Sequence, residues 1–307
     1  DVRMNEVLLS SPNCDPNIQD KDGNTPLHFA CNNGQNLFVS SLIELSPIEV
    51  DINAINGECQ TPLFIACLNN NFIMFNTLFS SKLADQIDIN LTSPIYIAAL
   101  KQNLDLFNIL FEMPGIDLNS NKNIMLNDDD HFKNHYHFEK MNLMHILSSF
   151  NQPELLNKLI ESNQFDVNEQ TAPDVENKMN GTPLIIALKN NQLGNFNLLV
   201  NRYQNELNLN LLDSNGMAAI HYCLYLNDER SSSLKKLLEI DDTIVNLKTN
   251  NKETPLMIAF HGNSTKSTIA LLQIPSINVF DQDSSFRTVL HHLASKRSSN
   301  ECIDSVL

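Results

Sequence analysis

One six-residue pattern recurs along this chain of 307 residues and constrains its fold more than any other feature. The pattern reads Thr-Pro-Leu-His-Phe-Ala where it begins at Thr25, and four further copies also begin with Thr or Ser followed by Pro. Three weaker copies keep the apolar positions. Repetition at such intervals predicts an array of similar units, each stacked on the next, and not one globular core. The eight copies begin at residues 25, 61, 93, 142, 182, 218, 254 and 288.

Each copy predicts the beginning of a short helix. A Thr or Ser hydroxyl can accept a hydrogen bond from an exposed N–H group of the first turn, and Pro fits the next position because it has no N–H to satisfy. In the first copy, Leu27, Ala30 and Cys31 have the spacing of one helical face. A second apolar segment follows, for example at residues 37–43 and 104–111. The sequence therefore predicts two short helices in each unit.

Two turn signals follow the same period. Nine residues after the Thr position stands Gly34 in the first unit and Asn in five others, and both residue types tolerate the left-handed backbone of a chain reversal. Gln102 and Arg297 depart from this rule. An Asp-x-Asn tripeptide also precedes several units, and we expect its Asn side chain to stabilise a turn. The tripeptides and their less regular equivalents place this Asn at residues 17, 53, 90, 119, 168, 210, 246 and 278.

With these markers, the sequence resembles the ankyrin repeat family, whose Thr-Pro-Leu-His-x-Ala signature recurs about every 33 residues. The resemblance covers nearly the whole chain and implies an all-α solenoid of helix–turn–helix units joined by short β-hairpin or finger loops. We expect about eight units and a partial one before them, in a single domain of residues 1–307. An insertion at about 120–140 and a shorter one near 171–180 interrupt the array. Because neither end has the polar character of a capping repeat, we expect a segment of a longer chain.

Charge and composition limit the kind of partner and the compartment. The chain has 36 Asp and Glu residues against 20 Lys and Arg, a formal net charge of −16. This balance argues against direct binding of nucleic acid and favours a basic partner. No apolar run reaches the roughly 18 residues of a membrane span, and the N-terminus has no signal-peptide pattern. Six Cys residues without a Cys-x-x-Cys pair favour a reducing compartment, the cytoplasm or the nucleus.

No catalytic motif is recognisable in the sequence. It contains no Gly-rich phosphate loop, nucleophile elbow or His-Glu-x-x-His segment, so we expect neither an enzyme nor a cofactor. One metal-binding alternative is formed by His131, His135 and His137 beside Asp130 in the insertion, since imidazoles at i and i+4 of a helix can share a metal ion. A solvated polar loop is the favoured interpretation, because neither a Cys partner nor an established zinc spacing accompanies the cluster.

A His occupies the fourth position of the repeated pattern in four units. These residues lie one per unit and a repeat apart, so they form no catalytic cluster along the sequence. The ankyrin resemblance implies instead that their side chains bond backbone groups and tie neighbouring repeats together. They are His28, His145, His221 and His291.

The resemblance also implies where a partner binds. In the ankyrin family, partners usually contact the concave face, which the finger tips and exposed parts of the first helices form. Tyr225 is the strongest single anchor that we expect, because aromatic side chains often dominate interface energy. Simple solvent exposure is the alternative for each residue. By position in the unit, the expected partner-binding residues are Lys21, Asp22, Asn24, Asn32, Asn33, Glu58, Gln60, Asn69, Lys101, Lys189, Asn190, Tyr225, His261, Arg287 and Lys296.

The leading functional hypothesis is a non-enzymatic scaffold that recruits a protein or peptide partner through its concave face and finger loops. An alternative is a regulatory or assembly module that docks within a larger multidomain protein, such as an enzyme, a channel, a trafficking factor or a transcription regulator. A metal-dependent protein that uses the cluster at 131–137 is a third hypothesis.

Overall fold

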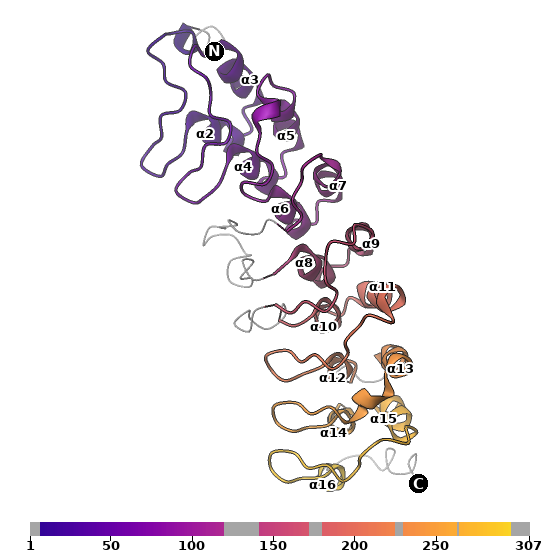
Figure 1. Cartoon of the computed structure of the whole chain (residues 1–307). Helices are drawn as coiled ribbons and strands as arrows, with labels where there is room; N and C mark the ends of the chain where they lie inside the picture. The colour runs from indigo at the N-terminus through magenta and orange to yellow at the C-terminus, as the bar shows by residue number, and fades with distance from the viewer. Residues whose placement is uncertain (1–6, 120–140, 172–179, 225–229, 263, 296–307) are drawn as a thin grey trace. The chain divides into compact units, whose positions relative to one another are not determined.

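The computed structural model describes residues 7–119, 141–171, 180–224, 230–262 and 264–295. Its contacts divide the chain into an N-terminal part, Asp1–Ile146, and a C-terminal part, Leu147–Leu307, and each part is described by itself (Figure 1). The expectation of a single domain stays a prediction. Several residues singled out in the sequence lie outside the described ranges: Asp130, His131, His135, His137, Tyr225, Lys296 and the rest of the predicted insertion.

The N-terminal part consists of paired helices, as the sequence predicts. The first helices of its units, α2, α4 and α6, contact one another in succession, and the second helices α3 and α5 also contact each other. Each second helix runs beside its own first helix, and the loops between units project on the other side (Figure 1). The elements are α2 (Pro26–Asn32), α3 (Asn36–Leu45), α4 (Pro62–Leu68), α5 (Phe72–Phe79), the 3-10 turn η1 (Ala84–Gln86), α6 (Pro94–Leu100) and α7 (Leu104–Glu112).

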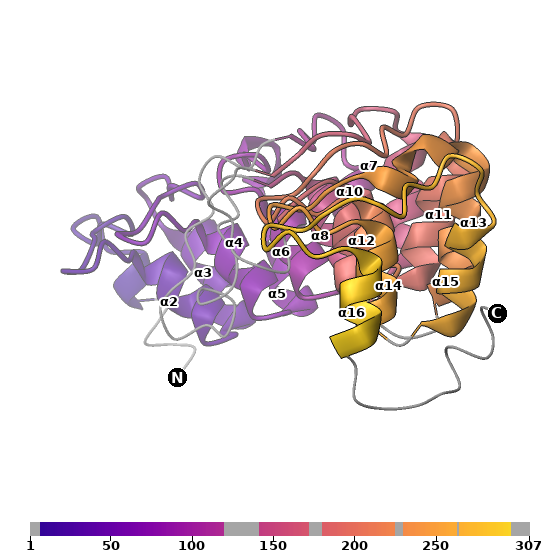
Figure 2. The ribbon, with the colours of Figure 1, turned by 90° about the horizontal axis from the view of Figure 1, so that it is seen from below.

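The C-terminal part repeats the same arrangement. Figure 2 shows its first helices α12, α14 and α16 in one row and its second helices α11, α13 and α15 in another. The boundary between the parts falls inside α8. The elements are α8 (Leu143–Ser149), α9 (Pro153–Glu161), α10 (Pro183–Lys189), α11 (Leu193–Tyr203), α12 (Ala219–Tyr222), α13 (Ser231–Ile240), the 3-10 helix η5 (Asp242–Asn246), α14 (Pro255–His261), α15 (Thr265–Leu272) and α16 (Val289–Ser295).

The architecture confirms the all-α helix–turn–helix array. Each of the eight predicted unit starts lies one residue before a helix, and no β-strand occurs within the described ranges. We name each unit by its predicted start, so that the unit at 25 contains α2 and α3. No helix in the described part of the chain is long and apolar enough to cross a membrane.

The core runs between the two helices of each unit and between neighbouring units. Leu27, Ala30 and Cys31 are at most 2% exposed, and Val39 and Leu42 on the second helix are equally buried. Small residues at these positions let adjacent helices approach closely, and burial of the apolar ones supplies about 25 cal/mol for each Å² removed from water. Later units bury the equivalent residues Leu63, Ala66, Cys67, Ile95, Ala98, Ala99, Leu184, Ala187 and Leu188.

Helix capping follows the prediction in three of the five units that begin with Thr or Ser followed by Pro. The hydroxyl groups of Thr61, Thr182 and Thr254 accept hydrogen bonds from the backbone N–H three residues later, at 3.1, 3.3 and 3.4 Å. The Thr25 hydroxyl is instead hydrogen-bonded to Nδ1 of the His28 ring, at 2.8 Å. Ser93 also departs from the prediction: its φ of 50° is left-handed, because the loop before it is shortened and must reverse within fewer residues.

The reversal after the first helix also follows the predicted rule. Gly34, Asn70 and Asn191 have φ values of 66°, 54° and 58°. Gln102 adopts the same conformation, with a φ of 55°, although its side chain is not typical of that region. Asn151, at the equivalent position, is not left-handed. The left-handed turn at Gln102 is therefore imposed by the packing of the array, since the local preference of a Gln residue does not favour it.

Candidate functional site

The loops before the units at 25, 61, 218, 254 and 288 each contain a five-residue finger built around one acceptor side chain. In the first, Asp20 Oδ1 accepts hydrogen bonds from the backbone N–H groups of Asp22 and Asn24 at 2.9 and 2.8 Å. In the second, Asn56 Oδ1 accepts from Glu58 and Gln60 at 3.0 and 2.9 Å. Asp213 and Asp283 do the same in the C-terminal part. The fingers comprise residues 20–24, 56–60, 213–217, 249–253 and 283–287.

Each finger turns at its fourth residue, which has a positive φ. Two of these residues are glycines, Gly23 and Gly216, but Cys59, Lys252 and Phe286 adopt the same conformation with φ values of 57°, 58° and 61°. The backbone N–H of the fourth residue donates to the carbonyl of the first residue in all five fingers. The backbone N–H of the first residue also donates to the carbonyl of the fifth, so each finger closes as a tight hairpin turn, although no β-strand is assigned to it within the described ranges.

Neighbouring fingers bond directly to one another. The Gly57 N–H donates to the Asp22 carbonyl at 2.8 Å, and Asn56 Nδ2 donates to Asn24 Oδ1 at 2.8 Å. A Cβ atom on Gly23 would lie only 2.7 Å from the Gly57 nitrogen, so this close approach requires glycine at position 23. The two fingers therefore form one continuous surface.

The pattern histidines link units as the resemblance implies. His28 Nδ1 accepts from the Thr25 N–H at 3.1 Å, so Nε2 carries the proton and donates to the Gln60 carbonyl at 3.0 Å. His221 makes the equivalent bonds to Ala218 and Leu247. Burial lowers the pKa of His28 below its usual value and the pKa of His221 to about 4. Both rings are therefore neutral structural links.

The Asp-x-Asn residues form a second set of links. Asn53 Nδ2 donates to the Gln86 carbonyl at 2.6 Å, and Asn53 Oδ1 accepts from the Asp88 N–H at 2.8 Å. Within its own turn, the Asn53 N–H donates to Asp51 Oδ1 at 3.0 Å. The expected turn-stabilising role is present at Asn53, and its side chain also bonds the next unit. The same pair of inter-unit bonds recurs at Asn17, Asn90, Asn168 and Asn246.

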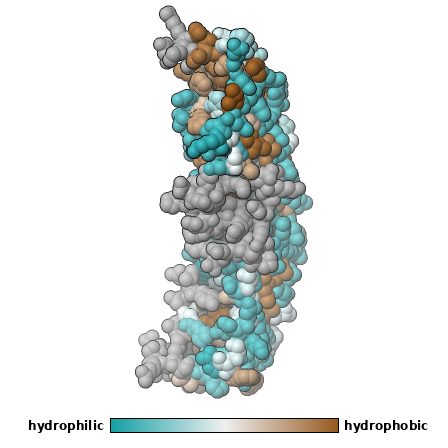
Figure 3. Space-filling model, turned by 90° about the vertical axis from the view of Figure 1, so that its left-hand side faces the viewer, coloured by the Kyte–Doolittle hydropathy of each residue, from teal (hydrophilic) through white to brown (hydrophobic). Residues whose placement is uncertain are grey.

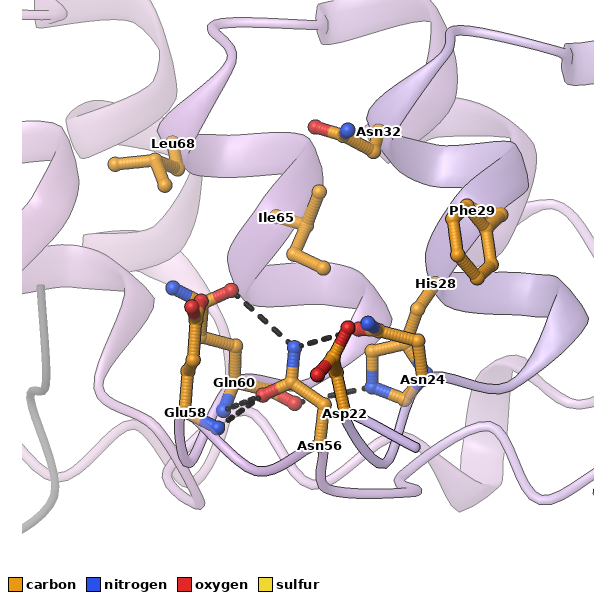
Figure 4. Close-up of a pocket in the computed structure, with 10 residues that line it drawn as sticks. All are labelled: Asp22, Asn24, His28, Phe29, Asn32, Asn56, Glu58, Gln60, Ile65 and Leu68. Carbon is orange, nitrogen blue, oxygen red and sulfur yellow. Dashed lines mark hydrogen bonds between the residues drawn. The ribbon is translucent and has the colours of Figure 1, made fainter. Parts of the chain in front are cut away.

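A hollow opens between the units at 25 and 61, where two fingers meet two first helices (Figure 4). Its volume of about 240 Å³ is below the roughly 300–1,000 Å³ of small-molecule sites, so it suits a side chain and a peptide group better than a cofactor. The lining residues come from α2, α4 and the fingers 20–24 and 56–60. They are Asp22, Asn24, His28, Phe29, Asn32, Asn56, Glu58, Gln60, Ile65 and Leu68.

The hollow is acidic and partly apolar. Asp22 and Glu58 bring a carboxylate from each finger, while the Phe29 ring is 49% exposed beside them. The surrounding residues 7–119 contain twelve Asp and Glu residues, three Lys residues and no Arg. Figure 3 views the finger side and shows hydrophobic residues scattered over a largely hydrophilic surface in the N-terminal part. A basic ligand with an apolar stem has complementary chemistry to this site.

Sequence reasoning identified part of this hollow and missed the rest. Of the expected partner-binding residues, Asp22, Asn24, Asn32, Glu58 and Gln60 line it. Asn69 is adjacent, because its Nδ2 donates to Asn32 Oδ1 at 3.0 Å. Phe29, Asn56, Ile65 and Leu68 were not anticipated. Asn56 could have been found, because it occupies the finger position of Asp20.

The side chain of Lys189 is buried in the C-terminal part of the chain. Its Nζ is 2.7 Å from Asp213 Oδ2, and the two side chains are 7% and 0% exposed. It also donates to the Asn180 carbonyl and lies 5.2 Å from the ring centre of Tyr222, whose hydroxyl donates to Asp213. Burial lowers the pKa of Lys189. Burial opposes the charge of Asp213 too, but the hydrogen bonds from Lys189 and Tyr222 outweigh it and lower that pKa.

His261 and Arg287 belong to a chain of polar contacts at the fingers 249–253 and 283–287. His261 Nε2 lies 2.8 Å from His292 Nδ1, and its other ring nitrogen lies 3.4 Å from Glu253. His292 and Arg287 both bond Asp283 Oδ2, at 3.0 and 2.9 Å. Burial acts to raise the pKa of Asp283, but hydrogen bonds from Arg287 and neighbouring backbone groups lower it to about 2.

The remaining expected residues are distributed over the units. Lys21 and Asn33 are exposed, whereas Lys101 and Asn190 are half-buried. Within the described ranges, no group of three His, Cys, Asp or Glu side chains is arranged to hold a metal ion. The candidate cluster Asp130, His131, His135 and His137 lies outside those ranges, as does the proposed anchor Tyr225.

Comparisons of the sequence and of the structure with known proteins both identify ankyrin repeats. A family model described as ankyrin repeats, in three copies, matches residues 3–93 and 143–244. Among solved structures, the ankyrin repeat domain of Bcl-3, a member of the IkappaB protein family, aligns with a TM-score of 0.52 and 21% identity. The alignment covers 82% of this chain and all of that one. At this identity, the structural likeness establishes the fold alone.

Proposed function

Because this chain belongs to the ankyrin repeat family, whose repeats are generally protein–protein interaction modules, we propose that it is a non-enzymatic scaffold that recruits a protein or peptide. The observation that carries the proposal is the convergence of Asp22, Asn32, Glu58 and Gln60 on one hollow. These residues come from two units and were expected at a binding face from their positions in the repeat. We call the surface of the fingers and the adjoining first helices the finger face.

The construction of the finger face supports this role. Its backbone is fixed by the bonds of Asp20 and Asn56 within each finger and by the contact between Gly57 and Asp22 across them. A surface that is ordered before a partner arrives loses little conformational entropy on binding. The finger face is therefore a better candidate for the binding surface than the second helices, whose inward sides pack in the core.

The proposed partner is a basic segment of a protein, not a nucleic acid. The excess of acidic residues in 7–119 would attract a positively charged segment and accelerate encounter. The same field would repel the phosphates of DNA or RNA.

We place this interaction in a reducing compartment, the cytoplasm or the nucleus. The cysteines within the described ranges are free thiols, and burial raises the pKa of Cys31 and of Cys223 to about 12. Buried thiols with such values are unreactive, so they serve as small core residues.

Charge reversal on the finger face tests the proposal. The pair Asp22→Lys and Glu58→Lys should abolish capture of partners that the unaltered chain retains in a pulldown with mass spectrometry. The matched control is Glu44→Lys with Asp105→Lys, which makes the same charge change at exposed positions of α3 and α7. Retention of every partner by the first pair, or equal loss with both pairs, would contradict binding at the finger face. A third arm lacking residues 121–139 tests whether the predicted insertion contributes.

A further inference from the structure

We propose that His261 and His292 together bind one proton more than two neutral rings carry, and that this proton fastens the unit at 288 to the unit at 254. The two rings belong to α14 and α16, and they lie edge to face with their centres 4.5 Å apart. The inference is independent of the proposed function, because it concerns the contact between two units and not a partner.

The two rings stand in the middle of a row of polar groups that crosses from one unit to the next. His261 Nδ1 lies 3.4 Å from Glu253 Oε1, and His261 Nε2 lies 2.8 Å from His292 Nδ1. At the other end of the row, His292 Nε2 lies 3.0 Å from Asp283 Oδ2. The side chains of His292 and Asp283 are 3% and 2% exposed, and that of Glu253 is 22% exposed. A carboxyl group therefore stands at each end of the histidine pair.

The number of protons in this row follows from its contacts. Despite its burial, Asp283 is ionised, because hydrogen bonds from backbone N–H groups and from Arg287 lower its pKa to about 2. His292 Nε2 must therefore carry a proton to be a hydrogen-bond donor to it. A neutral His292 then has an unprotonated Nδ1, so the proton between the rings belongs to His261 Nε2.

This arrangement leaves the outer nitrogen of His261 in conflict with its neighbour. If His261 is neutral, the lone pair of its Nδ1 faces the Glu253 carboxylate at 3.4 Å, and the two repel each other. One further proton on Nδ1 turns this contact into an ion pair. It also makes His261 a stronger donor to His292, because a hydrogen bond from a charged group is the stronger kind. The added proton therefore strengthens contacts on both sides of the ring.

The charges that contact the row act in both directions. Glu253 and Asp283 favour a positive charge between them, and His261 is the last residue of α14, where the carbonyl groups of the helix end also favour a cation. Arg287 opposes it, because its Nε bonds the same Asp283 oxygen at 2.9 Å. This guanidinium adjoins His292, so the added charge belongs on His261 beside Glu253.

The other titratable groups on the elements packed against α14 contribute less. His221 of α12 bonds the Leu247 carbonyl. Exposed charges are screened by water and salt, so they change the proton affinity of the pair only weakly. These exposed residues are Asp242 of η5, Lys252 of the finger 249–253, Lys266 of α15 and His291 of α16.

The proton gives the contact between the two units a pH dependence near neutrality. The row spans the fingers 249–253 and 283–287, which the Ser284 N–H also joins by donating to the Asn251 carbonyl at 2.8 Å. The folded row holds the proton more tightly than the unfolded chain does. Its stabilisation is therefore complete below about pH 6.5 and is lost as the pH rises through the titration midpoint of the folded pair.

Nuclear magnetic resonance of the histidine rings tests the proton count. The 307-residue chain is isotopically labelled at histidine Cε1 and titrated from about pH 5 to about pH 9, and the His261 signal is assigned by its loss in His261→Asn. We expect its midpoint to lie above about pH 6.5 and to fall by at least about 0.5 pH units in Glu253→Gln. The matched control is Glu239→Gln, which neutralises an exposed carboxylate of α13 and should leave the midpoint unchanged. A midpoint below about pH 6.5 in the unaltered chain, or equal midpoints in the two variants, would overturn the proposal.

Amide hydrogen exchange tests whether the proton fastens the two units. The N–H groups of Asp283 and Phe286 are bonded within their finger, so their protection reports its opening. After correction for the chemical exchange rate, this protection should fall about threefold or more between about pH 6 and about pH 8.5. The fall should be smaller in Glu253→Gln and unchanged in His291→Gln, which alters an exposed histidine of the same helix α16. Protection independent of pH, or an equal fall in all three proteins, would show that the proton does not hold the units together.

Discussion

The Nε2 atom of His28 lies 3.0 Å from the carbonyl oxygen of Gln60, so one imidazole joins the unit at 25 to the finger of the next unit. His28→Leu would leave the Thr25 N–H and the Gln60 carbonyl buried without this partner. We expect the free energy of unfolding to fall by about 2–4 kcal/mol in urea titrations followed by circular dichroism.

The control for this variant is His291→Leu. It changes the same residue type at the same pattern position, but His291 is exposed and its described bonds are to Thr288 of its own unit. A loss below about 1 kcal/mol is expected there. Equal losses for the two variants would contradict the linking role of His28.

The side chain of Asn53 forms two bonds to the next unit, so Asn53→Ala should destabilise the array. Loss of the contacts to Gln86 and Asp88 should cost about 1–3 kcal/mol, because both bonds to backbone groups disappear together. Urea unfolding provides the measurement. The comparison is Asn76→Ala on the exposed side of α5, for which a change within about 0.5 kcal/mol is expected. An Asn53 variant as stable as the Asn76 variant would rule out these inter-unit bonds as a source of stability.

Lowering the pH should reduce the free energy of unfolding of the C-terminal part, because the buried ring of His221 resists protonation. Burial holds the pKa of this ring at about 4, against an ordinary value of 6.5, so the unfolded chain binds more protons between these values. The corresponding stability is therefore complete above pH 6.5 and is lost as the pH falls to about 4, by roughly 3 kcal/mol in all. Unfolding titrations from about pH 7 to pH 4 measure it.

The comparison for the pH dependence is His221→Gln, which cannot take up a proton. Its stability should depend less on pH over this interval, and the carboxylates common to both proteins account for the remaining slope. Parallel curves for the two proteins would show that His221 does not carry the acid sensitivity.

The buried pair of Lys189 and Asp213 should show strong coupling. Lys189→Met leaves the Asp213 carboxylate without its cation and should cost about 3–5 kcal/mol. In Lys189→Met with Asp213→Asn, the amide oxygen can still accept the finger N–H groups, and much of the lost stability should return. A double-mutant cycle on urea unfolding measures the coupling. Additive losses would mean that the ion pair contributes nothing beyond its separate contacts.

The repeat, its helices and its turn positions were predictable from the sequence because each depends on local chemistry. Thr61 caps α4 through a bond within three residues, and Asn70 reverses the chain because its residue type tolerates a positive φ. Gln102 and Phe286 show the limit of such reasoning, since neighbouring units impose on them a conformation that their side chains do not favour.

The hollow was only partly predictable because it depends on how two units meet. Asp22 and Glu58 could be placed at the finger tips by counting from the pattern. Asn56 and Gln60 also form bonds that no single unit contains: Asn56 Nδ2 donates to Asn24 of the preceding finger, and the Gln60 carbonyl accepts from His28 of the preceding unit. Likewise, the position of Lys189 in the repeat predicted an exposed side chain. In the structure this side chain is buried, because it forms an ion pair with Asp213 of the following unit. The repeat pattern alone therefore does not determine which residues line the hollow or become buried, because this depends on interactions between units.

The most direct test of binding at the finger face is a hydrogen-exchange footprint of a bound partner on the unaltered chain. A partner from the pulldown is added in excess, and amide exchange is followed by mass spectrometry. We predict slower exchange in the fingers 20–24 and 56–60 and at the end of α2, with no change in α3 and α5. Protection confined to the second helices, or to segments outside the finger face, would contradict this prediction.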